Sequence, residues 1–154
     1  WARAQIKVIC KTYQYLEIGS FVGGTLCPFV NDDACNEILS IDNRGRQQPD
    51  ERGADYDYTA ITTKTMLDKI SSVNLSIDKI KTFDGDASEI DKNKNQSFNL
   101  AFIDGEHTDS ACFSDSINIR HMLLPDSIIL FDDSSLVYKS IRNIIYMKNI
   151  MTNE

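Results

Sequence analysis

The chain has 154 residues, of which 42% are hydrophobic and 25% are charged, and its net charge is −7. This length fits a single domain, and the apolar content excludes a disordered chain because it can form a core. The acidic excess argues against a nucleic acid as partner, since its phosphates would be repelled. The apolar runs are far shorter than the ~20 residues that span a bilayer, so no membrane association is expected.

The four cysteines are widely spaced and form no CxxC pair. They give no basis for a zinc cage or a thioredoxin-like redox site, and a reducing, cytoplasmic location is expected. The sequence opens at Trp1 without the charged and apolar pattern of a signal peptide. We expect residues 1–154 to form one domain, and the unusual first residue suggests a fragment of a longer chain.

Short apolar runs rich in β-branched residues alternate along the chain with longer, helix-like stretches. The expected helices cover residues 1–12, 24–31, 60–73, 86–91, 109–123 and 136–148. The expected strands cover residues 15–18, 37–41, 77–83, 98–103 and 127–131. Near-continuous hydrophobic strands that alternate with helices predict a parallel sheet covered on both faces, in a doubly wound α/β fold.

Residues 43–58, NRGRQQPDERGADYDY, interrupt this alternation. The segment is polar, lacks apolar periodicity and is long for a connection inside a compact domain. We therefore expect either a lid or a flexible excursion. If it closes over a ligand, its arginines, among them Arg44 and Arg46, could meet an anionic group. A solvated loop is the alternative.

Ligands of open parallel sheets bind beyond the carboxyl ends of the strands. Each expected strand ends in or is directly followed by at least one carboxylate. In chain order these residues are Glu17, Asp42, Asp84 with Asp86, Asp104 with Glu106, and Asp132 with Asp133. We therefore expect a row of acidic side chains at one edge of the sheet.

The first turn, EIGSFVGG, carries the glycines that a tight turn and a close ligand require. A dinucleotide-binding GxGxxG loop would need a glycine at the position of Phe21. The bulk of Phe21 and the charge of Glu17 both oppose a pyrophosphate at this turn. The turn thus favours a ligand without phosphates and argues against a nicotinamide-dependent oxidoreductase; an ordinary β–α turn is the alternative.

Two acidic residues suit the recognition of a nucleoside. Asp42, at the end of the second strand, could accept hydrogen bonds from both ribose hydroxyls, or could be a simple turn residue. Asp86 and Ala87 follow the third strand, where an adenine amino group could be recognised. Because Glu89 lies three residues further on, Asp86 could equally cap a short helix.

Five runs follow one another in a characteristic order: YLEIGSFVGGTL, ILSIDNR, FDGDASEI, FNLAFIDGEHTDSACFSD and LLPDSIILFDDSS. Together they resemble the class I S-adenosylmethionine-dependent methyltransferases. The resemblance is strongest to the metal-dependent small-molecule O-methyltransferases, the group of catechol and macrolide-sugar O-methyltransferases, and covers about residues 13–135. It implies a three-layer Rossmann-like sheet with strand order 3-2-1-4-5. The last two strands of that family have no counterpart in this sequence.

The resemblance implies S-adenosyl-L-methionine as cofactor. The implied cofactor-binding residues are Glu17, Gly19, Ser20, Phe21, Gly23, Asp42, Asn43, Asp86, Ala87 and Asp104. It also implies Asp104, Asp132 and Asp133 as ligands of Mg²⁺ or another hard divalent cation. Converging carboxylates repel one another unless a cation neutralises them, and oxygen ligands select such an ion. Asp132 and Asp133 can both bind it only if the strand ends before Asp133, because neighbours on a strand point to opposite faces.

His107 follows Asp104 closely, and an imidazole with a pKa of about 6.5 could accept a proton from a substrate hydroxyl. Asp104 and His107 are therefore the candidate catalytic residues, although a structural role is the alternative for His107. Asp109 is expected to be a helix-start charge, and Asp115 is expected on the solvated face of the same helix.

The expected reaction is transfer of a methyl group from S-adenosylmethionine to an oxygen of a small-molecule acceptor with hydroxyl groups, assisted by a divalent metal. Three alternatives stay open. They are a metal-independent methyltransferase of the same fold, a nicotinamide-dependent oxidoreductase, and a non-catalytic nucleoside-binding domain.

Overall fold

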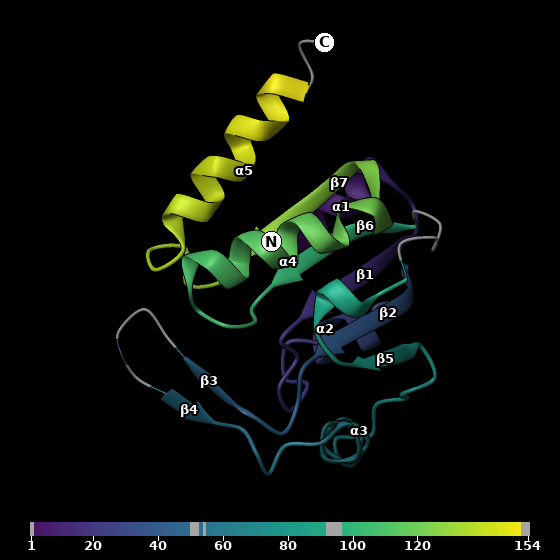
Figure 1. Ribbon diagram of the computed structural model, residues 1–154. Coiled ribbons are helices and arrows are strands. Elements are labelled where there is room, and N and C mark those ends of the chain that lie inside the picture. The colour runs from purple at the N-terminus through teal and green to yellow at the C-terminus, as the bar shows by residue number, and fades with distance from the viewer. Residues whose placement is uncertain (1, 50–52, 54, 92–96, 152–154) are drawn as a thin grey trace.

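The computed structural model describes residues 2–49, 53, 55–91 and 97–151, and a five-stranded sheet forms its centre (Figure 1). Its strands are β1 (Tyr13–Ile18), β2 (Cys35–Asp42), β5 (Ile80–Asp84), β6 (Phe98–Ile103) and β7 (Leu123–Phe131). They are ordered β5-β2-β1-β6-β7, and each neighbouring pair is parallel. Counted within this sheet, the order is 3-2-1-4-5, which confirms the predicted doubly wound topology.

The described helices agree with the predicted ones in place, although most are shorter. The α-helices are α1 (Ala2–Ile9), α2 (Cys27–Val30), α3 (Thr63–Ser72), α4 (Asp109–Ile119) and α5 (Tyr138–Met151). The predicted helix at 86–91 is a single 3-10 turn, η1 (Ala87–Glu89), and a second 3-10 turn, η2 (Arg120–Met122), follows α4. Within the described part of the chain, no helix is long and apolar enough to cross a membrane.

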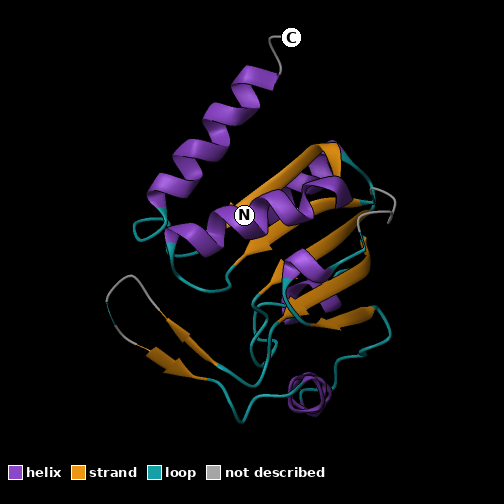
Figure 2. Ribbon diagram, viewed as in Figure 1, coloured by secondary structure: helices purple, strands orange, loops and turns teal. Residues whose placement is uncertain are grey.

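Helices cover both faces of the sheet (Figure 2), and two apolar clusters fill the space between the layers. One cluster joins Leu16 and Ile18 of β1 to Cys112 and Ile119 of α4. The other joins Tyr15 of β1 to residues of α1, α2 and α3. Because successive side chains of a strand point to opposite faces, β1 is buried on both sides, as a near-continuous hydrophobic strand predicts.

The segment 43–58 contains a feature that the sequence did not predict. It forms an antiparallel hairpin of β3 (Gln47–Pro49) and β4 (Asp55–Asp57), which stands apart from the main sheet (Figure 1). Gln47 pairs with Asp57, and both residues are exposed. A hairpin that does not pack on the core needs no alternating apolar residues, which explains why its pattern resembles a loop.

Candidate active site

The residues beyond the carboxyl ends of the strands line two adjoining cavities. The first, of about 170 Å³, is lined by Gly19, Phe21, Asp42, Arg44, Tyr58, Ile61, Asp104, Gly105 and His107. The second, of about 140 Å³, is lined by residues that include Asn43, Arg46, Asp86, Ala87, Glu106 and Asp115. Gly19, Asp42 and Gly105 line both cavities. The predicted gathering of acidic side chains at this edge of the sheet is therefore present.

The turn after β1 packs directly against the end of β6. Gly19 has φ +83°, and a Cβ at this position would lie 1.9 Å from the carbonyl oxygen of Asp104. Only glycine fits this approach. Phe21 also has a positive φ of 47°. Its half-exposed ring meets the Tyr58 ring edge-on, with the centroids 5.3 Å apart.

Three residues predicted to bind the cofactor line neither cavity. Glu17 is fully buried and accepts hydrogen bonds from the hydroxyls of Tyr15 and Thr25. It points away because it alternates along β1 with the residues of the opposite face, and burial raises its pKa to about 7. The Ser20 hydroxyl accepts a hydrogen bond from Ser40 at 2.9 Å, and Gly23 packs against α3. Cofactor contacts of these three residues stay a prediction.

Asp42 occupies the junction of the two cavities. Its carboxylate Oδ2 accepts a hydrogen bond of 2.8 Å from the backbone N–H of Phe21, which ties the end of β2 to the turn after β1. Burial raises the pKa of Asp42, and the guanidinium of Arg44 opposes this rise. With its Oδ2 held by the protein, Asp42 presents a fixed acceptor to the space between the cavities.

Arg44, which could have met an anionic ligand, is already engaged by the protein. Its Nη1 lies 2.7 Å from Asp84 Oδ1, and its Nη2 donates to Ser40 Oγ at 2.8 Å. The side chain is 4% exposed. Its charge is therefore balanced by Asp84 and, at 3.8 Å, by Asp42.

Asp86 was predicted either to contact adenine or to cap a short helix, and the structure shows the cap. Its side chain accepts a hydrogen bond of 2.8 Å from the backbone N–H of Ser88 at the start of η1. This bond and a side-chain interaction with Ser88 lower the pKa of Asp86. Asp86 and the buried Ala87 also line the second cavity, so the cap does not remove them from the site.

Asp115 corrects the expectation of a solvated residue. Its side chain lies on the buried face of α4, together with Cys112, Ser116 and Ile119, and it lines the second cavity. Burial raises the pKa of Asp115 to about 7, and the negative charges of Asp86 and Glu106 add to the rise. The sequence indicates this burial through the spacing of residues 112, 115, 116 and 119, which places them on one face of the helix.

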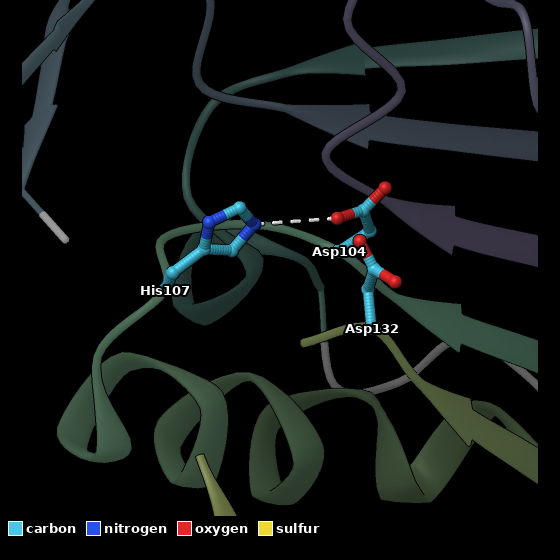
Figure 3. Close-up of side chains that lie close together, drawn as sticks. All are labelled: Asp104, His107 and Asp132. Atoms are coloured by element: carbon cyan, nitrogen blue, oxygen red, sulfur yellow. Dashed lines mark hydrogen bonds and ion pairs between the residues drawn. The ribbon is translucent and has the colours of Figure 1, made fainter. Parts of the chain in front are cut away.

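Asp104, His107 and Asp132 converge where β6 and β7 end (Figure 3). Each offers one ligand atom, and these atoms lie within 4.8 Å of one another. His107 Nε2 is 3.4 Å from Asp104 Oδ1. Burial raises the pKa of Asp104 to about 6; the nearby Asp132 adds to this rise, whereas His107 opposes it.

This group has the chemistry and nearly the dimensions of a metal site. Metal bonds of about 2.0–2.3 Å place opposite ligand atoms about 4–4.6 Å apart, close to the observed spread. Two carboxylates and an imidazole suit a hard or borderline divalent cation. A cation would also relieve the repulsion between Asp104 and Asp132. The residues present therefore fit a divalent ion.

The position of Asp133 differs from the predicted ligand set. β7 ends at Phe131, so Asp132 and Asp133 both lie beyond the strand, as joint binding would require. However, the described cluster contains His107 instead of Asp133, and Asp133 Oδ2 lies 3.4 Å from His107 Nδ1. Metal-binding histidines commonly bond a carboxylate through their other ring nitrogen. Asp133 is therefore placed to orient the His107 ring.

Comparisons with known proteins agree with this geometry. Residues 16–134 match the family model described as a methyltransferase domain. A comparison with curated protein sequences finds no match.

Similar solved structures share the fold at low identity. PaMTH1, a methyltransferase of Podospora anserina solved with SAH, is 18% identical with a TM-score of 0.58 over 83% of this chain and 49% of its own. PKMT2 of Rickettsia typhi, solved with AdoHcy, is 14% identical with a TM-score of 0.54 over 77% of this chain and 20% of its own. TrmK of M. capricolum, solved with S-adenosyl-homocysteine (SAH), is 14% identical with a TM-score of 0.52 over 79% of this chain and 47% of its own.

The chain thus spans less than half of the length of each of these three structures. The match to the family model covers most of the sequence and includes the ends of all five strands of the main sheet. The chain belongs to the methyltransferase domain family and has the Rossmann-like fold of class I S-adenosylmethionine-dependent methyltransferases.

Proposed function

We propose that the chain binds S-adenosylmethionine across the two cavities. The observation that carries this proposal is the junction of the cavities at Gly19, Asp42 and Gly105. A ribose at Asp42 directs the sulfonium towards Asp104 in the first cavity and the adenine towards Asp86 and Ala87 in the second. The hydrogen bond from Phe21 to Asp42 holds the ribose acceptor in place before the cofactor arrives.

The proposed reaction is methyl transfer to an oxygen of a small acceptor that carries hydroxyl groups. A C–O bond forms as the C–S bond breaks, the acceptor loses its hydroxyl proton, and S-adenosylhomocysteine leaves as a neutral thioether. The protein chiefly aligns the two reactants. Asp104 Oδ1 and His107 Nε2 lie 3.4 Å apart beside the first cavity, and without a metal either atom can accept the proton. With a cation bound, the carboxylate oxygen of Asp104 that the cation leaves free would accept it.

Metal assistance forms the second part of the proposal. A divalent cation held by Asp104, His107 and Asp132 would polarise the acceptor oxygen and lower the pKa of its hydroxyl. If the reaction is metal-independent, Asp104 and His107 interact with the acceptor directly. A small molecule is preferred to a nucleic acid as acceptor because the net charge is −7. The four cysteines are free thiols, in keeping with a proposed cytoplasmic location.

Titration calorimetry with S-adenosylhomocysteine tests the cofactor part. We expect binding by the wild-type chain and a loss of about 10- to 150-fold in affinity for Asp42→Ala, because a hydrogen bond to a charged acceptor contributes about 1.5–3 kcal/mol. Asp78→Ala is the control, since Asp78 is an exposed aspartate just before β5. Absence of binding by the wild-type chain would refute the proposal, and an unchanged affinity of Asp42→Ala would remove Asp42 from the site.

A further inference from the structure

The second cavity is lined by a largely buried side chain, that of Asp115, whose carboxylate accepts no hydrogen bond from the described residues and keeps some accessible surface. Asp115 is 9% exposed, and no hydrogen bond or ion pair reaches it from the residues that the structure describes. A Cβ added at Gly105 would lie 3.2 Å from Asp115 Oδ2, so the carboxylate reaches from α4 to the end of β6. A largely buried carboxylate without a protein partner is stabilised by any donor that reaches it through the cavity. Its position in the wall of the cavity suggests that a ligand supplies the partner.

The same cavity contains an unsatisfied donor. Arg46 lines it, and the Nε of Arg46 is buried without a hydrogen-bond partner in the described part of the chain. The far end of this side chain is directed elsewhere, since Nη2 lies 3.7 Å from Glu106 Oε2. Among the groups that line the cavity, the acceptor Asp115 and the donor Arg46 Nε have no hydrogen-bond partner in the described part of the chain.

We infer that Asp115 and Arg46 recognise the edge of the adenine base, a step that rests on the proposed function. The exocyclic amino group of adenine donates to the Asp115 carboxylate, and Arg46 Nε donates to a ring nitrogen of the base. An adenine edge carries this pair of complementary groups. The adjacent Asp86 is less available, because its side chain already accepts the hydrogen bond from Ser88. Asp115 is therefore the residue that selects a 6-amino purine.

The electrostatics of the cavity agree with this assignment. Burial, Asp86 and Glu106 all raise the pKa of Asp115, whereas Arg46 lowers it. A neutral N–H donor satisfies such a carboxylate without bringing a second charge into the cavity. If Asp115 were merely a buried neutral acid that packs against β6, it would not discriminate between base edges.

Calorimetry with two ligands tests the inference: S-adenosylhomocysteine and S-inosylhomocysteine, whose base carries a 6-oxo group in place of the amino group. The wild-type chain should prefer the adenosyl ligand by about 10- to 100-fold, since the oxo group offers Asp115 an acceptor instead of a donor. Asp115→Asn should lose most of this preference or reverse it, because its amide can donate to the oxo group. Asp126→Asn, an exposed aspartate on β7, should keep the wild-type preference.

The possible outcomes distinguish a failure of this inference from a failure of the proposed function. Equal wild-type affinity for both ligands would overturn the inference without any variant, and so would an Asp115→Asn chain that keeps the full preference. Binding of neither ligand by the wild-type chain would instead overturn the proposed function. Thermal unfolding of each variant verifies that a lost preference does not reflect a lost fold.

Discussion

The two cavities lie at the same edge of the sheet and share Gly19, Asp42 and Gly105, yet the carboxylates specific to each are arranged differently. In the first, Asp104 is grouped with His107 and Asp132 at the ends of two strands. In the second, Asp115 comes from a helix and belongs to no such described cluster, although Asp42, Asp86 and Glu106 line the same cavity. Carboxylates whose oxygens converge on one point favour a cation, whereas a largely buried carboxylate without a hydrogen-bond partner favours a neutral donor. Acidic residues at one sheet edge can therefore serve two unlike ligands.

Substitution of Gly19, which lines both cavities, should have the largest effect on stability. Gly19→Ala places a methyl group 1.9 Å from the Asp104 carbonyl and requires a positive φ of an alanine. We expect the free energy of unfolding to fall by about 2–5 kcal/mol, measured by urea denaturation. Gly24→Ala is the matched control from the same turn, because a Cβ there meets nothing within 4 Å. Equal stability of the two variants would show that the turn can move away from β6.

The difference between the cavities predicts opposite losses in a pair of variants. Asp132→Asn should weaken Mn²⁺ binding about 10- to 100-fold and leave the affinity for S-adenosylhomocysteine nearly unchanged. Asp115→Asn should do the reverse. Calorimetry of each chain with each ligand measures all four values. If both variants lose both affinities, the cavities act as one site, and the contrast between them fails.

The pH dependence of stability provides a smaller but sharper test. Glu17 and Asp115 have pKa values of about 7 in the folded chain, whereas unfolded carboxyl groups titrate near pH 4. The folded state therefore binds more protons between about pH 4 and pH 7, and its stability should fall as the pH rises through this window.

Glu17→Gln and Asp115→Asn should each remove about 1–3 kcal/mol of this fall, measured by urea unfolding at about pH 5 and about pH 8. Saturating S-adenosylhomocysteine should abolish the contribution of Asp115 and leave that of Glu17, which lines neither cavity. Asp104 adds to the fall and Asp86 opposes it near pH 4, so each variant is compared with the wild type. A variant that keeps the full wild-type fall would contradict the pKa direction of its residue.

The sequence predicted the topology and the location of the site because both depend on local patterns. The strand at 98–103 coincides with β6, since a short hydrophobic run buried on both faces has few alternatives. The carboxylates gather because parallel strands end at one edge. The direction in which each carboxylate points does not follow from the strand order. Glu17 lines neither cavity and bonds Tyr15 and Thr25, so its predicted contact with the cofactor stays a prediction.

Other parts of the site depend on contacts that no local pattern contains. The spacing of Asp115 places it on one helix face with Cys112 and Ile119, but that it lines a ligand-sized cavity depends on how α4 lies against the sheet. The β3–β4 hairpin is formed by the sequences QQP and DYD, which lack the alternation of apolar and polar residues that identifies a strand. The contact between His107 Nδ1 and Asp133 joins two segments far apart in the sequence, and Asp133 lies in the turn after β7 with a φ of +40°.

The approach of Gly19 to the Asp104 backbone leaves no room for even a methyl group. The turn that carries Gly19 and the backbone of Asp104 must therefore move together. If S-adenosylmethionine binds as proposed, its entry and release depend on the rim, where the Tyr58 ring packs on Phe21 next to the β3–β4 hairpin. Under that proposal, turnover alters the entrance and leaves the alignment of the two reactants unchanged.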